Sequence, residues 1–432
     1  MGISKQPPKK FPITKGLPCQ LKWTFSTVYL TDGKSASCHK AKLHDYNVNG
    51  EFNFHNQPGK INERQQMLDG KWPSGCESCK HIEEAGGHSD RVIQLYLEGN
   101  TAPPELDKDL DATTVTPRQL EIYWGNTCNM KCIYCGPHYS NKIHAEQKRF
   151  GRFDQDGVVL DPDDFTLNPN IKRDTDRLFE WFEKNIQHLH KIYVFGGEPF
   201  LQVETERMIQ FLEKRTLPDL TLIFFSNLNV EHERVKRWVD RLEKLIEQQR
   251  LDKLVIVGSL DAWGEPGEYV RSGLDLKLFE KNFEYILHNT SVQQQINSAL
   301  TVTSVPGMVQ MVEKINQWSK TKPIYWSFLK AADRDMESGN GYLYPGIFGD
   351  KINALGLTKA IDTFDTNTDG FPDSVKIAQK KYMEGHVKEF ADAKPDLRKQ
   401  KQLKTYLTLL DKRRGTDYTK VFPEISDWLK DL

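Results

Sequence analysis

The sequence of 432 residues contains no apolar run that approaches the roughly 18 consecutive residues of a membrane-spanning helix. Its start, Met1 to Lys15, is basic and contains three prolines, but it lacks the apolar core of a signal peptide. The formal charge of -1 supplies no long-range field that would attract nucleic acid or an anionic membrane. We therefore expect a cytoplasmic chain without membrane or nucleic-acid partners.

Cysteine is absent after residue 135, and the seven cysteines that precede this point are an odd number. A complete disulfide framework is therefore excluded, and a chain of this length does not need one. Hydrophobic residues make up 38% and charged residues 28%, an ordinary globular composition that excludes disorder along the whole length. At about 150 residues per domain, the length predicts two or three domains.

The middle of the chain alternates between apolar strand patterns and amphipathic helix patterns. Nearly continuous apolar strands separated by such helices are typical of a parallel sheet with right-handed crossovers. Periodicity alone leaves an incomplete barrel and a doubly wound sheet both open. The six predicted strands are 120–125, 191–197, 220–227, 253–261, 296–303 and 323–329.

The regions on either side have a different composition. Residues 17–100 form short strands, turns and short helices, with a hairpin expected at Asp32-Gly33, and they contain too few apolar residues for a large core. Something other than burial therefore helps to hold this region together. Residues 1–16 are read as a tail, 101–117 as a linker, 150–173 as an insertion, and 331–432 as a helical C-terminal extension.

Three cysteines, Cys128, Cys132 and Cys135, directly follow the first predicted strand of the alternating region. Loops at the carboxyl ends of parallel strands are where α/β folds build their sites. Closely spaced thiolates select iron-sulfur clusters or zinc. A structural zinc site uses four protein ligands, whereas three leave one metal position free for another ligand.

The string NTCNMKCIYCGP, with Tyr134 before the third cysteine, resembles the signature of radical S-adenosylmethionine (SAM) enzymes. The resemblance implies a [4Fe-4S] cluster held by Cys128, Cys132 and Cys135, with SAM bound to the fourth iron. It also implies reductive cleavage of SAM to a 5'-deoxyadenosyl radical, which abstracts a hydrogen atom from a substrate. Tyr134 is included among the cofactor-binding residues.

Further matches to this family lie at the ends of later strands. Gly196-Gly197-Glu198-Pro199 resembles the GGEP motif that receives the SAM ammonium group, and glycine there permits close backbone approach. The other positions that the resemblance assigns to SAM are Ser226, Asn227, Ser259, Asp261 and Arg271, with Val305 near the adenine. The serine, asparagine and aspartate side chains could instead cap turns and helices, and both readings stay open.

The remaining cysteines, Cys19, Cys38, Cys76 and Cys79, equal in number the ligands of a closed all-cysteine site for zinc or an iron-sulfur cluster. Their pattern resembles the SPASM/twitch modules of radical SAM enzymes, which implies an auxiliary [4Fe-4S] cluster. Those modules normally follow the barrel, whereas this one precedes it. A redox relay, a substrate anchor and a structural role are all open, and four-cysteine ligation favours the relay or the structural role.

These observations predict an α/β protein with a partial (β/α)6 TIM-like barrel over 118–330, an N-terminal auxiliary-cluster module and a C-terminal helical extension. The resemblance implies an oxidoreductase or transferase that uses a reductant such as flavodoxin or ferredoxin and acts on a peptide or a small molecule. No catalytic residue acting on substrate is identified. The alternative is a non-catalytic iron-sulfur or zinc protein for electron transfer or binding on the same fold.

Overall fold

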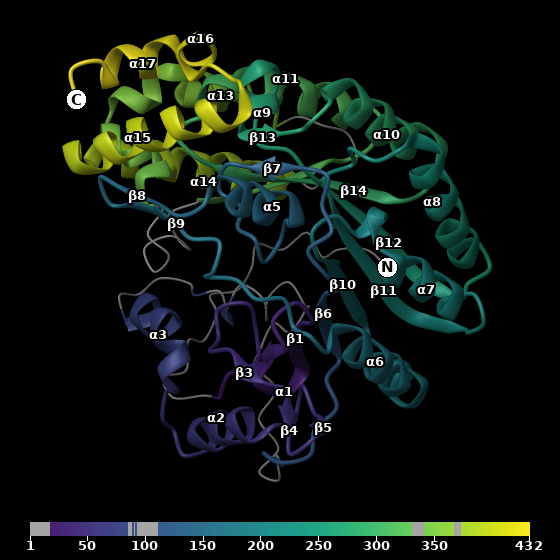
Figure 1. The fold of residues 1–432 in the computed structure, drawn as a ribbon. Coiled ribbons are helices and arrows are strands. Elements are labelled where there is room, and N and C mark those ends of the chain that lie inside the picture. The colour runs from purple at the N-terminus through teal and green to yellow at the C-terminus, as the bar shows by residue number, and fades with distance from the viewer. Residues whose placement is uncertain (1–17, 85–88, 90, 93–110, 331–340, 367–372) are drawn as a thin grey trace. The chain divides into compact units, whose positions relative to one another are not determined.

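The computed structural model describes residues 18–84, 89, 91–92, 111–330, 341–366 and 373–432 (Figure 1). The expected tail 1–16, most of the expected linker and the first ten residues of the expected extension lie outside these ranges. The chain divides into two compact units. Unit 1 comprises residues 1–123 and 167–193, and unit 2 comprises residues 124–166 and 194–432.

The strands of unit 1 begin with β1 (Phe25–Tyr29), which pairs in parallel with β6 (Gln119–Tyr123). On its other side β1 pairs antiparallel with β2 (Lys34–Ala36), and Gly33 between them adopts a φ of 70°. This hairpin confirms the turn expected at Asp32-Gly33. Strands β3 (His44–Asp45), β4 (Asn47–Val48) and β5 (Glu51–Phe52) are short.

Unit 1 also contains helices, and the first of them was not expected from the sequence. Residues Leu21–Thr24, expected as the start of a strand, form the one-turn helix α1. The others are α2 (Pro58–Leu68), α3 (Glu77–Glu84) and α6 (Ile171–Asn185). A small core gathers around Trp23, Phe25 and Met67, and it includes Cys19 and Cys76. Two of the cysteines thus belong to the core of a region that is poor in apolar residues.

Unit 2 contains a parallel sheet of strands in sequential order. β11 (Leu217–Ser226) pairs with β12 (Leu251–Ser259), which pairs with β14 (Gln293–Leu300), which pairs with β15 (Tyr325–Lys330). A doubly wound sheet reverses its strand order at one point, and these four strands do not. β10 (Lys191–Phe195) is divided between the two units. The four strand positions match four of the predicted strands, and their order is compatible with a partial barrel.

The helices that connect these strands bury one apolar stripe each. Five side chains at three- and four-residue spacing are buried on α8 (His232–Glu247), and Asp275 caps α10 (Leu276–Asn289) by accepting the main-chain N–H groups of Lys277 and Leu278. Figure 1 shows α8 and α10 side by side along the sheet. The other connecting helices are α7 (Val203–Leu212), α9 (Glu265–Val270) and α11 (Met308–Ser319).

The rest of unit 2 consists of the insertion and the C-terminal helices. After α5 (Asn141–Phe150), the insertion forms a hairpin of β8 (Phe153–Gln155) and β9 (Val158–Leu160). The expected extension is helical in its described part: α13 (Thr358–Thr363), α14 (Asp373–Asp392), α15 (Leu397–Arg414), α16 (Tyr418–Val421) and α17 (Pro423–Leu429). Among the described residues, no helix is both long and apolar enough to cross a membrane.

The expected domain boundaries stay a prediction, but two elements group with the N-terminal residues in unit 1. β6 was expected to open a domain beginning at residue 118, but it groups with the N-terminal residues because its partner is β1. α6 groups with unit 1 for a similar reason, since its Asp174 accepts hydrogen bonds from Tyr46 and Asn47. A boundary drawn from composition alone does not register such long-range pairing.

Candidate functional site

The segment with Cys128, Cys132 and Cys135 is shaped by main-chain hydrogen bonds in unit 2. Strand β7 (Lys131–Cys132) pairs antiparallel with β13 (Arg271–Ser272), which sets Cys132 opposite Arg271. The main-chain N–H of Cys135 then donates to the carbonyl oxygen of Cys132 at 3.1 Å, closing a tight turn. The three thiols are therefore carried by one folded loop.

The thiols of this loop influence one another electrostatically. Burial, together with the neighbouring thiol of Cys132, raises the pKa of Cys128 to about 12 and raises that of Cys135 as well. Burial also raises the pKa of Cys132, although the charge of Arg271 opposes this effect. Arg271 Nη1 donates to Cys132 Sγ and Asn227 Nδ2 donates to Cys128 Sγ, each at 3.9 Å. Two donors thus face sulfurs that would carry negative charge as metal ligands.

The thiol side chains of this loop are the type of ligand that iron-sulfur clusters use. All seven cysteines of the chain are free thiols. Within the described residues, no group of three or more His, Cys, Asp or Glu side chains already converges as a metal site. Binding therefore requires the thiols to turn towards a common centre and to lose their protons, which a metal ion promotes. The three thiols, with Arg271 and Asn227 donating towards them, suit that change.

Gly196 and Gly197 pack directly against the start of the cysteine loop. The N–H groups of Gly197 and Glu198 donate to the carbonyl oxygens of Gly125 and Thr127, both at 2.8 Å. A Cβ on Gly197 would lie 2.3 Å from Thr127 O, and Gly196 has a φ of 135°. Only glycine satisfies both positions without moving the loop.

Glu198 is fully buried, and its carboxylate accepts hydrogen bonds from other residues of the protein. Its oxygens accept hydrogen bonds from the N–H of Phe200 at 3.0 Å, the hydroxyl of Ser226 at 2.8 Å and the N–H of Asn227 at 2.6 Å. Burial, partly offset by these donors, raises the pKa of Glu198 to about 7. None of the three donors carries a formal charge. Glu198 therefore ties the end of β11 to the turn that follows the glycine pair.

Ser226 and Asn227 also stabilise their own turn. The Ser226 hydroxyl accepts from the N–H of Leu228, and Asn227 Oδ1 accepts from the N–H of Asn229, both at 2.9 Å. Both side chains thus cap their own turn, and ligand contact stays a prediction for Ser226. Asn227 additionally reaches the thiol of Cys128, so ligand contact stays a prediction for this residue.

Asp261, Arg271 and Tyr134 form one buried network after β12. Arg271 Nε pairs with Asp261 Oδ2 at 2.9 Å, and the Tyr134 hydroxyl donates to the same oxygen at 2.6 Å. The main-chain N–H of Ala299 donates to Asp261 Oδ1 at 2.7 Å. Asp261 thus positions both the arginine that faces Cys132 and the tyrosine that precedes Cys135.

The remaining predicted residues lie nearby in the fold. Pro199 begins a buried 3-10 turn after Glu198, and Val305 begins another one after β14. Ser259 ends β12 and is half-buried, and within the described residues its hydroxyl makes no hydrogen bond to the Asp261 network. The structure therefore brings the cysteine loop, Glu198, Asn227 and the Asp261 network together, but it does not join Ser259 to them.

Several residues of this site were missed from the sequence. Asn129 Oδ1 accepts from Asn227 Nδ2 at 2.9 Å. Glu146 on α5 accepts from Lys131 in the loop at 2.5 Å and from Arg414 on α15 at 3.0 Å. The polar residue Asn129 inside the cysteine motif was a usable signal. No local signal could reveal Arg414, because it is distant in sequence and is linked to the loop only through Glu146.

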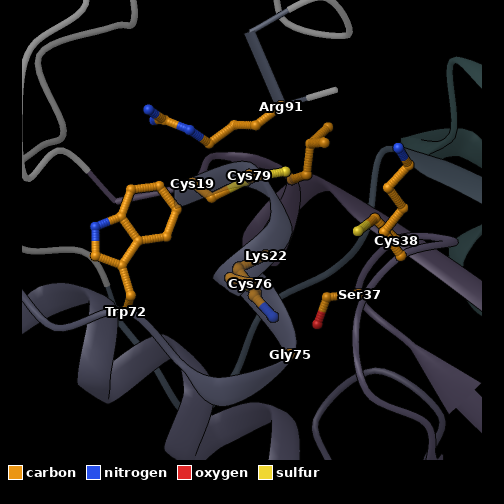
Figure 2. Close-up of a pocket in the computed structure, with 11 residues that line it drawn as sticks. Cys19, Lys22, Ser37, Cys38, Trp72, Gly75, Cys76, Cys79 and Arg91 are labelled. Carbon is orange, nitrogen blue, oxygen red and sulfur yellow. The ribbon is translucent and has the colours of Figure 1, made fainter. Parts of the chain in front are cut away.

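The other four cysteines line one cavity in unit 1. Figure 2 shows Cys19, Cys38, Cys76 and Cys79 around it. Burial is the main cause that raises the pKa of Cys19, and the neighbouring thiols of Cys38 and Cys76 raise it further. The cavity therefore gathers thiols from the residues before α1, the segment after β2, the turn before α3 and α3 itself.

Two cations face these thiols. Lys22 is 2% exposed, and its Nζ pairs with Glu63 Oε2 at 2.6 Å. Burial opposes the charge of Lys22, but the attraction of Cys76 and Glu63 outweighs burial and raises the pKa of the lysine. Arg91, which pairs with Glu83, also lines the cavity. A four-thiolate metal site carries negative charge, which these cations would offset.

Comparisons with known proteins found a weak structural likeness. No family model matches the chain, and no curated protein matches it. One solved structure that it resembles is described as native anSMEcpe with bound AdoMet and Kp18Cys peptide. The match has 15% sequence identity and a TM-score of 0.33, and it covers 56% of this chain. It spans 59% of the other chain, less than two thirds of its length.

Proposed function

We propose that the chain is a radical SAM enzyme whose [4Fe-4S] cluster is held by Cys128, Cys132 and Cys135. The bound cluster and SAM would supply reductive cleavage of the sulfonium and a 5'-deoxyadenosyl radical that abstracts a hydrogen atom from a substrate. The observation that carries this proposal is that the Gly196-Gly197 backbone packs onto the loop that holds the three thiols. These thiols are close enough to raise one another's pKa.

Each further residue has a role that its contacts support. Arg271 and Asn227 offset charge at the sulfurs they face. Asp261 holds Arg271 in place, and its second oxygen orients the main chain at Ala299. The glycine pair lets the main chain of the cysteine loop pack directly against residues 196 and 197. Glu198 contributes mainly by holding the end of β11, because its oxygens are already engaged.

The cavity of Cys19, Cys38, Cys76 and Cys79 is proposed to hold an auxiliary [4Fe-4S] cluster, with zinc as the alternative. Four cysteine ligands leave no open metal position, which favours electron transfer or structural support over substrate binding. The electron donor is proposed to be a flavodoxin or ferredoxin. The substrate is proposed to be a peptide or a small molecule.

The proposal is tested by anaerobic reconstitution with iron and sulfide, reduction with dithionite, addition of SAM and quantification of 5'-deoxyadenosine. We expect product from the wild type and none from Cys132→Ser, whereas Cys76→Ser should retain SAM cleavage. About 8 iron atoms per chain in the wild type, falling to about 4 in each variant, would support two clusters. Absence of 5'-deoxyadenosine from an iron-loaded wild type would instead favour a non-catalytic electron-transfer protein.

A further inference from the structure

A groove on unit 2 has no cysteine among its lining residues. One wall is a stripe of α15 that includes Lys404, Thr405, Thr408 and Lys412. The facing wall comes from the end of α5 and from the β8–β9 hairpin. Positions spaced by three and four residues lie on the same side of a helix, so these α15 side chains point in one general direction.

The two walls are joined by hydrogen bonds, so the groove is already formed. Asp156 of the hairpin accepts from the Thr405 hydroxyl at 2.8 Å and pairs with Lys401 Nζ at 2.9 Å. Further along, Arg413 Nη2 donates to the carbonyl oxygen of Gly151 at 3.5 Å. Asp156 therefore holds the two walls together, so binding needs little rearrangement of the main chain.

The charges of the groove do not balance. Asp156 is the only acidic side chain among its lining residues, and the basic ones are Arg152, Lys401, Lys404, Lys412 and Arg413. Asp156 neutralises Lys401, and Arg152 pairs with Asp154 and Asp161. Lys404 donates to main-chain oxygens of Lys430 and Leu432. Within the described residues, Lys412 is exposed and makes no ion pair.

Arg413 has unmet hydrogen-bonding capacity beside an exposed aromatic ring. Its Nε and Nη1 are shielded and find no partner in the part of the chain that the structure describes. Guanidinium donors left unmet cost free energy, which an acceptor could restore after a turn of the side chain. The guanidinium lies 5.1 Å from the ring centre of Phe150, which is 42% exposed. Cations and an apolar platform therefore lie together.

We propose that this groove binds an acidic peptide segment that also carries apolar side chains. Carboxylates would pair with Lys412 and Arg413, and an apolar side chain would cover Phe150. The chain's net charge of -1 lacks the extended positive field that binding along a polynucleotide requires, so the local patch favours a peptide. The proposal does not depend on SAM chemistry.

Fluorescence anisotropy of the full-length protein provides the test, with a fluorescein-labelled peptide of alternating glutamate and leucine as the probe. We expect Lys412→Glu and Arg413→Gln each to weaken binding about tenfold. The matched control is Lys420→Glu, because Lys420 is 83% exposed and lies outside the groove. Circular dichroism melting verifies that each variant is folded, and the exposed position of Lys412 makes its variant the safer one.

Three results would overturn the proposal. Binding that survives Lys412→Glu in a folded protein would place the peptide elsewhere. If a peptide with glutamine in place of glutamate bound equally well, the carboxylates would not be what the groove recognises. A single-stranded oligouridylate that binds more tightly than the acidic peptide would reassign the groove to nucleic acid and also reject the proposal.

Discussion

The hydroxyl of Tyr406 on α15 donates a hydrogen bond to the main-chain carbonyl oxygen of Ile133, between the second and third cysteines of the loop. Two turns further along the same helix, Arg414 pairs with Glu146, which also holds Lys131. One C-terminal helix thus braces the loop on both sides of Cys132. The C-terminal extension is part of the cysteine site, although its sequence carries none of the motif.

Removing the Tyr406 hydroxyl tests this brace. We expect Tyr406→Phe to destabilise the protein by about 1 kcal/mol and to speed amide hydrogen exchange in residues 128–135, because the loop loses a buried hydrogen bond. Hydrogen exchange followed by mass spectrometry measures the effect. Tyr285→Phe serves as the control, since it removes a hydroxyl bonded to Asp240 on the helices that flank the sheet. Equal exchange of the loop in both variants would contradict the role of Tyr406.

The glycine pair allows a second test. An alanine methyl group at Gly197 would overlap Thr127 O, so Gly197→Ala should displace the loop and lower iron retention after reconstitution by up to about half, the share of one of the two proposed clusters. Iron is measured by a ferrozine assay after desalting. Gly136→Ala is the matched control, because a Cβ there meets no atom within 4 Å although Gly136 follows Cys135 directly. Iron loss in the control alone would refute the argument.

Glu146 predicts a pH dependence of stability. Burial alone would raise its pKa, but hydrogen bonds from Arg414 and Lys131 outweigh burial and hold the pKa below the ordinary value of 4.5. Its contribution to stability is therefore full above about pH 4.5 and is lost as the pH falls through the depressed pKa. Urea unfolding should show Glu146→Gln less stable than wild type near pH 6, with the difference shrinking towards pH 3. A constant difference would argue against an ionised Glu146.

The buried pair of Lys22 and Glu63 predicts a large loss of stability. Lys22→Met leaves the Glu63 carboxylate buried without its ion pair to lysine, although the hydrogen bonds to His44 and Ser37 remain, which should cost about 3–5 kcal/mol. The double variant with Glu63→Gln should recover part of this loss. Lys236→Met is the control, because its pair with Asp240 is 41% and 39% exposed and should be worth less than about 1 kcal/mol. Urea unfolding midpoints compare the four proteins.

Strand positions in the middle of the chain could be predicted because their cause is local. The apolar runs before Asn227 and Asp261 form β11 and β12, and polar residues follow where the strands end. The grouping of Glu198 with Asn227 also followed, since residues at the carboxyl ends of neighbouring parallel strands meet. The spacing of the cysteines predicted one loop, and one loop carries them.

The parts that could not be predicted depend on long-range pairing. The parallel contact of β1 with β6 moved β6 into unit 1, and no pattern within either segment indicates its partner. Leu21–Thr24 form a helix although their apolar residues continue the strand pattern, and the side chains of Leu21 and Trp23 pack in the small core of unit 1. The burial of Lys22 and Glu63 could not be predicted either, since isolated charged residues are ordinarily exposed.

The pairing register of β7 and β13 determines whether the Arg271 side chain faces Cys132. Neighbouring residues of a strand project to opposite sides, so a shift by one position would turn Arg271 away and present Ser272 to the cysteine instead. Single-residue insertions or deletions in the α9 segment should therefore damage the protein more than most substitutions there. Chains that diverge from this one would be expected to vary α9 in composition while keeping its length.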